Sequence, residues 1–536
     1  MMKDEEKRML SKKQKEHQKL IVYQIYPRSF KDSNGDGIGD LNGITEKLDY
    51  LKELGINAVW LSPCYKSPNE DNGYDISDYR DIMDEFGTLD DWKRMIDEMH
   101  KRGIKLIMDL VANHTSSGHK WFRESRKSKD NPYRDYYYWA DKPLTDWNSV
   151  FGGSAWEYDK ATNQYYLHSF AVGQPDLNWE NPKVREEMKA VVDYWVDLGV
   201  DGFRCDVLDC ISKDFKSWKM GNGPRFHEFV HELFGRVEAE HIFTVGECSL
   251  NNAEDIKKLI GADRGELSTV FQFDHIDVGR RSKFAPQPFK LDEIRDRLIK
   301  WQTVFQENDL VGTLFFENHD QPRAVSRFGS EENRYESATM LAAMSYLQRG
   351  IPFIYQGQEI GSIDPHYDSI DDFDDIETLN YYRMNPDNVD KAELMRRINF
   401  GSRDNSRRPM PWSDEKNGGF GGDPWLPLHN RYKDINVRSD MSADRSVFKF
   451  FKELIALRTN NEAFTDGSWE NLTEGRDGMY IYRRYTDCES YIVVCNFENE
   501  SVLDTDYTGE CVLSNNGRRE INGVYAPYEC AVYKER

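Results

Sequence analysis

The feature that most constrains the fold is a repeated alternation of short apolar runs and helical patterns. Each run has the length and the β-branched and aromatic content of a buried strand, with glycine or polar residues on both sides. Between most runs, apolar residues recur at i, i+3 and i+4, as on one face of an amphipathic helix. The eight runs span residues 21–27, 56–62, 104–111, 200–207, 242–247, 269–273, 311–317 and 351–357. This pattern predicts an α/β chain built on a (β/α)₈ TIM barrel.

The spacing of the runs is uneven in two places, and its character changes near the C-terminus. The segment after the third run is rich in Tyr, Trp, Asn, Asp and Gly and is too long for an ordinary loop, so we expect an inserted rim subdomain there. A second excursion is expected after the eighth run. Short alternating segments separated by Asn-Gly and Asp-Gly turns predict an antiparallel β domain at the end of the chain. The predicted boundaries are a charged tail or helix at 1–19, the barrel at 20–114 and 183–461 with an excursion at 362–430, the inserted subdomain at 115–182, and the β domain at 462–536.

Charge and composition exclude several classes of partner. Lys and Arg total 71 against 94 Asp and Glu, and the resulting net charge of −23 repels nucleic-acid phosphates and anionic lipid headgroups. No apolar run approaches the ~18 residues of a spanning helix, and the first residues lack the apolar core of a signal peptide. The eight cysteines are scattered without a CxxC pair, as expected for reduced thiols. We therefore expect a cytoplasmic protein with a small-molecule partner and no nucleic-acid or membrane partner. A monomer is also expected, although no sequence feature determines the oligomeric state.

Three acidic residues lie where predicted strands end, which in a barrel of this kind is the edge that carries the reacting groups. Arg204 and Asp206 are two apart on one strand and so share a face, where the cation keeps the carboxylate ionised, as a nucleophile requires. Glu247 ends another strand, where apolar neighbours raise the pKa of a carboxyl group and suit it to general acid catalysis. Asp320 follows the seventh run and is a candidate for binding sugar hydroxyls.

Five sequence blocks carry a resemblance to a known family. They are DLVANHTSSGH at 109–119, QPDLNWENP at 174–182, GFRCDVL at 202–208, TVGE at 244–247 and ENHDQPR at 317–323. In order and spacing they closely resemble the α-amylase superfamily of glycoside hydrolases (glycoside hydrolase family 13). Together with DSNGDGIGDLNGI at 32–44 and RDNSRRPMPW at 403–412, they are similar to its branch of oligo-1,6-glucosidases, dextran glucosidases and α-glucosidases.

The resemblance implies a role for each of the acidic residues. Asp206 would be the nucleophile, Glu247 the acid and then the base, and Asp320 the carboxylate that holds and distorts the sugar. Arg204 would orient the nucleophile. Two carboxylates about 5 to 5.5 Å apart would form and hydrolyse a covalent glucosyl-enzyme with retention of configuration.

The resemblance also implies residues that bind the non-reducing glucose. Asp75 and Arg407 match residues that would close the pocket into an exo-acting site, with Arg403 the less favoured choice in place of Arg407. His114 and His319 match histidines that hydrogen-bond glucose hydroxyls. Outside these blocks, such histidines would be interpreted as core residues.

Residues 32–40 offer oxygen ligands at alternate positions. The donors are Asp32, Asn34, Asp36, the carbonyl of Ile38, and Asp40. This is half of an EF-hand loop, without the bidentate Glu, but the hard-oxygen chemistry still suits Ca²⁺ or Mg²⁺. The resemblance implies a divalent cation here too, in a structural role. The alternative is a glycine-rich turn held by Asx hydrogen bonds.

The combined prediction is a retaining, exo-acting α-glucosidase of short oligosaccharides with no organic cofactor. Val207, directly after the proposed nucleophile, resembles members that prefer α-1,6 bonds. Leaving-group recognition is less defined, because TVGECS at 244–249 departs from the usual TVGEMPG and Lys283 aligns poorly with a lysine of the +1 subsite. The alternatives are hydrolysis or glucosyl transfer on sucrose, trehalose or trehalose 6-phosphate and, remotely, a non-catalytic interaction relative of the same fold.

Overall fold

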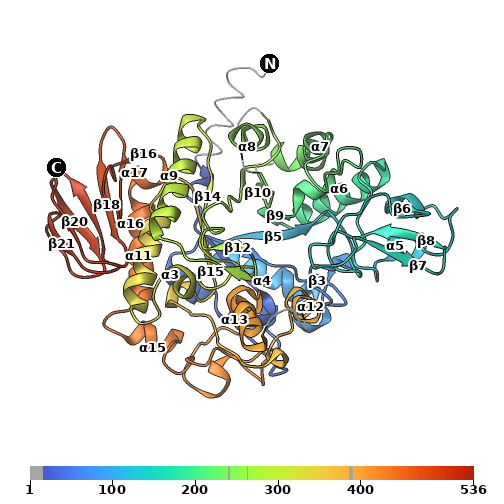
Figure 1. Ribbon diagram of the computed structural model, residues 1–536, viewed down its shortest axis with the longest axis horizontal. Helices are drawn as coiled ribbons and strands as arrows, with labels where there is room; N and C mark the ends of the chain where they lie inside the picture. Colours follow the sequence, from blue (N-terminus) through green and yellow to red (C-terminus); the bar gives the residue numbers. More distant parts are fainter. Residues whose placement is uncertain (1–15, 240–241, 251, 262–263, 386–389) are drawn as a thin grey trace.

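The structure is a computed structural model that describes residues 16–239, 242–250, 252–261, 264–385 and 390–536. The charged segment predicted at 1–19 therefore falls almost entirely outside the described residues. Figure 1 shows three parts in a row, with a central barrel between a small three-stranded unit and a C-terminal β domain. Within the described ranges, every helix is too short or too polar to cross a bilayer.

The eight predicted strands all form, and they line up as one parallel sheet. They are β1 (Val22–Ile25), β2 (Ala58–Leu61), β5 (Lys105–Val111), β9 (Gly202–Asp206), β10 (Phe243–Gly246), β11 (Thr269–Val270), β14 (Thr313–Leu314) and β15 (Ile351–Tyr355). Their order is β11-β10-β9-β5-β2-β1-β15-β14. The Thr269 hydroxyl donates to the Val311 carbonyl at 2.7 Å across the remaining seam, next to β11 and β14. The predicted barrel is confirmed.

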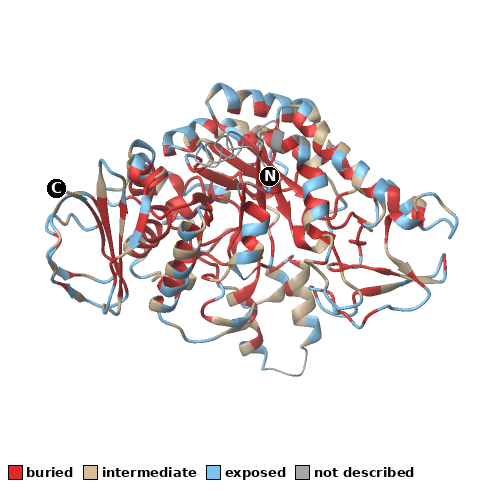
Figure 2. Cartoon of the chain, turned by 90° about the horizontal axis from the view of Figure 1, so that it is seen from above, coloured by how far each residue is buried: buried red, intermediate tan, exposed pale blue. Residues whose placement is uncertain are grey.

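Helices cover the outside of the barrel, and Figure 2 shows their exposed outer faces around buried strands. They include α2 (Leu41–Glu46), α3 (Leu48–Leu54), α4 (Leu89–Lys101), α6 (Pro182–Asp197), α7 (Phe226–Ala239), α8 (Ala253–Ile260), α9 (Leu291–Glu307), α10 (Ala324–Phe328), α11 (Arg334–Tyr346) and α16 (Val447–Asn460). In α4, Thr88 and Asp91 form a capping box at the N-terminus. Its buried residues Trp92, Met95, Ile96 and Met99 follow helical spacing, so one stripe packs on the strands.

Two insertions form the rim at the carboxyl end of the strands. After β5, α5 (Lys120–Ser125) and an antiparallel sheet of β6 (Trp139–Ala140), β8 (Gln164–Leu167) and β7 (Trp156–Asp159) make the inserted subdomain. This subdomain has a small core of its own around Trp147 and Trp156. After β2, the hairpin of β3 (Tyr65–Lys66) and β4 (Asp78–Ile82) supports a loop that bears Asp71 and Asp75.

The excursion after β15 adds further rim elements. It contains α12 (Ile376–Met384), α13 (Lys391–Gly401) and the short α14 (Asp404–Arg407), followed by α15 (Val437–Ser442). A hairpin of β12 (Arg280–Ser282) and β13 (Ala285–Pro286) lies against α13. A Cβ atom at Gly401 would lie 2.2 Å from the carbonyl oxygen of Lys283, so glycine permits this close approach. The excursion thereby brings α14, with Arg403 just before it and Arg407 at its end, to the rim.

The C-terminal β domain follows α17 (Glu462–Thr465) and is antiparallel, as predicted. One sheet has the order β16 (Ser468–Asn471), β17 (Met479–Tyr485), β18 (Ser490–Asn496), β22 (Cys530–Glu535) and β20 (Gly509–Ser514). A second, two-stranded sheet pairs β19 (Ser501–Leu503) with β21 (Gly523–Tyr525). A second apolar core lies within this domain.

Candidate active site

Two of the predicted acids share one arginine. Asp206 is the last residue of β9, and Glu247 directly follows β10, the neighbouring strand. Arg204 Nη1 donates to Asp206 Oδ1 at 2.7 Å, and Nη2 of the same guanidinium donates to Glu247 Oε2. The two carboxyl groups therefore lie next to one another, with 11% of the Asp206 side chain and 21% of the Glu247 side chain exposed to the pocket.

A third carboxylate on Arg204 was not predicted from the sequence. Asp109 lies within β5, is fully buried, and accepts from Arg204 Nη1 at 3.0 Å. It also accepts from Trp60 Nε1 and the Tyr74 hydroxyl. The signal for Asp109 was present in the sequence, because an acidic residue inside the apolar run KLIMDLV needs a buried partner.

One guanidinium cannot neutralise three carboxylates, so the site holds a proton near neutrality. Burial raises the pKa of Glu247 to about 7, with Arg204 opposing and the charges of Asp206 and Asp320 adding to the rise. Burial raises the pKa of Asp206 as well, to about 7, although Arg204 opposes the rise. The prediction that Arg204 keeps this carboxylate ionised is therefore wrong near neutrality, because burial outweighs the neighbouring cation. Such a pair titrates as a unit, and a single proton shared between the two is available to a leaving group.

Asp320 has the opposite electrostatics. Burial alone would raise the pKa of Asp320, but the positive charges of Arg407 and Arg403 outweigh it and hold this pKa well below its usual range. Arg407 Nη2 lies 2.8 Å and Arg403 Nη1 3.6 Å from Asp320 Oδ1. Asp320 is therefore ionised throughout the physiological range.

The predicted histidines both line the pocket in neutral form. Burial lowers the pKa of His319 well below its usual value and also lowers that of His114. His319 Nε2 lies 2.6 Å from the Tyr74 hydroxyl, and its Nδ1 lies 2.8 Å from Gln24 Nε2. His114 Nε2 lies 3.1 Å from Gln174 Nε2.

Asp75 does not line the pocket, and the neighbouring Asp71 does. The carboxylate of Asp75 accepts from the Ser67 hydroxyl and from the backbone N–H groups of Glu70 and Asp71 at 2.9 to 3.0 Å. It therefore shapes the loop that carries Asp71. Asp71 Oδ1 lies 2.9 Å from Arg403 Nη2 at the pocket wall.

The two arginines likewise differ from the prediction. Arg403 lines the pocket, whereas Arg407 is fully buried behind it, where it donates to Asp320 and to the His319 carbonyl. Asp71 and Arg403 thus occupy the positions expected of Asp75 and Arg407. The physical reason is that Asp75 binds the backbone of its own loop, whereas Arg407 lies behind Asp320 and His319 and binds them from the buried side.

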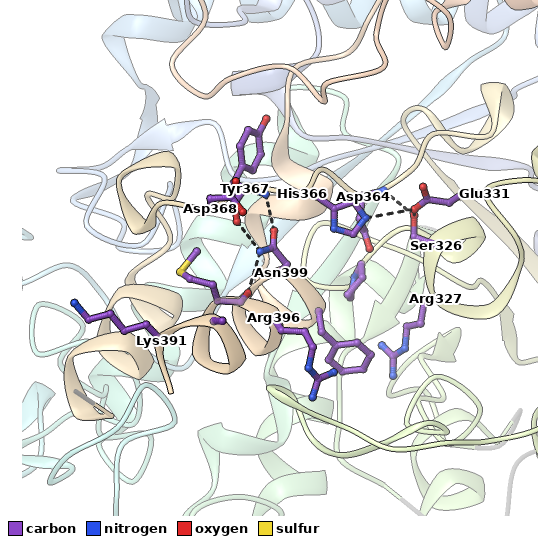
Figure 3. A pocket seen from close by; sticks show the side chains of 14 residues that line it. Ser326, Arg327, Glu331, Asp364, His366, Tyr367, Asp368, Lys391, Arg396 and Asn399 are labelled. Carbon is purple, nitrogen blue, oxygen red and sulfur yellow. Dashed lines mark hydrogen bonds and ion pairs between the residues drawn. The ribbon is translucent and has the colours of Figure 1, made fainter. Parts of the chain in front are cut away.

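The pocket encloses about 370 Å³, a volume suited to a small ligand. Asp71 and Arg403 pair with one another in its wall, and Phe151 and Phe170 of the inserted subdomain also line it. A larger cavity of about 830 Å³, shown in Figure 3, lies between α10, α13 and the loop at 364–368. It contains none of the predicted site residues, so the conjunction of charged groups rather than cavity size identifies the site.

In the predicted metal loop, side-chain oxygens accept hydrogen bonds from backbone N–H groups of the same loop. Asp32 is buried, and its carboxylate accepts from the N–H groups of Asn34, Gly35, Gly37 and Gly422 at 2.6 to 3.0 Å. These are the Asx hydrogen bonds of the alternative interpretation. Carboxylate oxygens keep further lone pairs, and the donor set suits a hard cation. In the part of the chain that the structure describes, no three acidic, histidine or cysteine side chains converge as metal ligands.

A (β/α)₈ barrel with two carboxyl groups side by side in a small pocket at the carboxyl ends of its strands is the arrangement of a glycoside hydrolase. Residues 24–467 match the family described as alpha amylase, catalytic domain. The chain therefore belongs to the alpha-amylase family.

Relatives of known activity match over nearly the whole chain. An oligo-1,6-glucosidase of Parageobacillus thermoglucosidasius is 48% identical, across 96% of this chain and 98% of its own. A trehalose-6-phosphate hydrolase of Bacillus subtilis is 41% identical, across 96% and 97%. Among solved structures, an isomaltulose synthase variant from Erwinia rhapontici with sucrose bound has a TM-score of 0.92 at 40% identity, across 96% and 98%.

Proposed function

We propose that the protein is a retaining, exo-acting α-glucosidase that releases glucose from the non-reducing end of short α-glucosides, with α-1,6 linkages preferred. The observation that carries this proposal is that Asp206 and Glu247 bind one guanidinium in a pocket that the ion pair of Asp71 and Arg403 also lines. Oligo-1,6-glucosidases among the relatives support the linkage, as does the apolar Val207 beside the nucleophile.

In the proposed reaction, Asp206 Oδ2 attacks the anomeric carbon while Glu247 gives its proton to the departing oxygen. A covalent glucosyl-enzyme forms, and the bond to the leaving sugar breaks. Glu247, now ionised, takes a proton from water, which attacks the same carbon and releases glucose. Arg204 orients both carboxyl groups, and Asp109 holds Arg204 from below. Asp320, kept ionised by its arginine partners, binds the glucose hydroxyls.

Exo action follows from the closed end of the pocket. The ion pair of Asp71 and Arg403 faces the space where a sugar chain would otherwise continue. Carboxylate and guanidinium groups can bind the terminal glucose hydroxyls, together with His114 and His319. A longer chain can then extend only toward the open rim.

The related alternative is the same chemistry on sucrose, trehalose or trehalose 6-phosphate. The similarity to a trehalose-6-phosphate hydrolase and to an isomaltulose synthase supports this alternative. The deciding experiment is one panel of isomaltose, maltose, sucrose, trehalose and trehalose 6-phosphate, read by glucose release. We expect isomaltose to have the highest kcat/KM. A faster rate on maltose would overturn the proposed preference for α-1,6 linkages, and a preference for another disaccharide would favour the alternative.

Asp206→Asn should lower turnover by at least about 10³-fold with the melting temperature retained.

We further propose that residues 32–40 hold a structural Ca²⁺, with Mg²⁺ as the alternative. Asp32, Asn34, Asp36, the Ile38 carbonyl and Asp40 would be the ligands. A bound cation would neutralise the carboxylates and fix the loop beside α2. It has no part in the proposed reaction, and no organic cofactor is needed.

We also propose a monomeric, cytoplasmic enzyme with a saccharide as its partner and with no nucleic-acid or membrane partner. The eight cysteines all lie within the described ranges as free thiols, which agrees with a reducing compartment. Cell fractionation and size-exclusion chromatography test these two statements. Recovery in a secreted fraction or elution as a dimer would contradict them.

A further inference from the structure

A second hollow continues the catalytic pocket on the far side of Glu247. It encloses about 310 Å³ and shares Val207, Asp209, Glu247, Ser249 and Gln321 with the first. The residues that close the glucose end, Asp71 and Arg403, line only the first hollow. Since Glu247 is the proposed proton donor to the departing oxygen, the second hollow lies where the leaving group would be.

Asp209 is the carboxylate at the junction of the two hollows. It lies on the short 3-10 turn of Leu208–Ile211. This turn begins directly after Val207, whose backbone adopts φ 35° and ψ 45°. A β-branched residue rarely adopts this left-handed conformation, so surrounding contacts must enforce the turn that places Asp209 here. Only 7% of Asp209 is exposed, and its Oδ2 accepts the backbone N–H of Ser249 at 3.2 Å. Among the described residues, Asp209 has no ion-pair partner within 4.0 Å.

The cations of these hollows are already paired. Arg280 Nε lies 3.1 Å from Asp277 Oδ1, and Lys283 Nζ lies 2.5 Å from Glu377 Oε2. Arg403 pairs with Asp71. The part of the chain that the structure describes therefore offers an anionic leaving group no unpaired Lys or Arg in these linings, while the Asp209 carboxylate would repel it.

We propose that Asp209 is a specificity-determining residue that accepts a hydrogen bond from a hydroxyl of the departing sugar and discriminates against phosphorylated leaving groups. This inference rests on the proposed function. A neutral sugar ring fits the polar lining of Asp209, Ser249, Gln272 and Gln321. A carboxylate is a strong acceptor for such a hydroxyl, because a hydrogen bond to a charged group is stronger than one between neutral groups.

The test compares Asp209→Asn with the unmodified enzyme on isomaltose and on p-nitrophenyl α-glucoside, whose leaving group has no sugar hydroxyls. The amide keeps an oxygen for the Ser249 N–H, so folding is expected to be retained. We expect kcat/KM for isomaltose to fall about tenfold, mainly through KM, and the aryl glucoside to change less than about twofold. The ratio of kcat/KM for trehalose 6-phosphate to that for trehalose should rise.

The controls separate this inference from the function on which it rests. Asp506→Asn makes the same substitution at an exposed site of the C-terminal domain and should match the unmodified enzyme. Failure of the unmodified enzyme on isomaltose would reject the proposed function. Equal losses on both substrates, or no loss on isomaltose, would overturn the role of Asp209 alone. If Asp209→Asn does not fold, Asp209→Ser provides the same comparison.

Discussion

At the scale of single residues, Arg204 sets the charge balance of the pocket. It donates to Asp109, Asp206 and Glu247, and it is 1% exposed, so no water competes for its donors. Its single positive charge faces three carboxyl groups. The excess negative charge and burial together keep a proton on the pair of Asp206 and Glu247 at a pH where isolated carboxyl groups have lost theirs.

The pH dependence of catalysis follows from this balance. The acid must be protonated to act, and burial raises the pKa of Glu247 from its usual 4.5 to about 7. We therefore expect kcat/KM on isomaltose to fall as the pH rises through about 7. A profile from pH 4 to 9 measures this. In Glu247→Gln, the residual rate on an aryl glucoside should lack that alkaline limb, and persistence of an identical limb would contradict the assignment.

The neighbouring acids Asp71 and Asp75 should respond differently to the same substitution. Asp71→Asn removes the charge that faces the glucose pocket, so we expect kcat/KM to fall about 10- to 100-fold with the fold intact. Asp75→Asn weakens the bonds that hold the loop, and the free energy of unfolding should fall by about 1–3 kcal/mol. Kinetics on isomaltose and denaturant unfolding measure the two effects. A larger kinetic loss for Asp75→Asn would reverse the assignment.

At the scale of elements, rim loops position the side chains that the barrel strands cannot. The strands place Asp206 and Glu247 directly, because adjacent parallel strands end at the same edge. The loop between β3 and β4 supplies Asp71 from outside the barrel, and the residue that precedes the short α14 supplies Arg403. The loop at 32–40 likewise joins two distant rim segments, because the Asp32 carboxylate accepts a hydrogen bond from the Gly422 N–H group in the excursion after β15.

Removal of the proposed cation should weaken the contact between the loop at 32–40 and Gly422. A ligand that binds only the folded state at about 100 times its Kd adds about 2.7 kcal/mol to the free energy of unfolding. We expect Ca²⁺ to raise the melting temperature relative to EDTA, and Asp36→Asn to reduce that rise without changing kcat. Asp506→Asn should keep the full response. Identical melting curves in Ca²⁺ and EDTA would reject the cation.

At the scale of the whole molecule, buried arginines bind the C-terminal end of the barrel helix α11 from α16 and from the C-terminal domain. Arg458 of α16 is fully buried and donates to the carbonyls of Tyr346 and Gln348 at 2.8 and 2.9 Å, just at the end of α11. Arg484 of β17 donates to the Leu347 carbonyl at 3.0 Å. Free carbonyls at a helix C-terminus favour a nearby cation. These arginines therefore supply hydrogen-bond donors to carbonyls that have no partner within the helix.

Removal of the Arg458 charge should therefore destabilise the whole chain rather than the site. Arg458→Met leaves buried carbonyls without donors, and we expect a loss of about 3 kcal/mol in the free energy of unfolding. The exposed Arg519→Met is the matched control and should leave stability unchanged. Denaturant unfolding measures both variants. Equal stability of the two would show that the contact between α16 and the end of α11 does not depend on this residue.

The sequence by itself determined the barrel and which acidic residues meet in its pocket. Strand periodicity is a local property of the sequence, and a carboxyl group at the end of a parallel strand lies at the carboxyl edge of the barrel. Asp206, Glu247, Asp320 and Arg204 were predicted on that basis. The rim insertions were also visible in the sequence, because their composition and length interrupt the alternation of strand and helix.

Only the tertiary structure decided which of two neighbouring residues lines the pocket. Asp71 and Arg403 are 332 residues apart in sequence, and their contact depends on how two rim segments fold across the barrel. No local pattern separates Asp71 from Asp75 or Arg403 from Arg407, because each pair differs only in the direction that its loop imposes on the side chain. The hollow beside Glu247, with Asp209 at its entrance, is likewise a product of packing between distant segments.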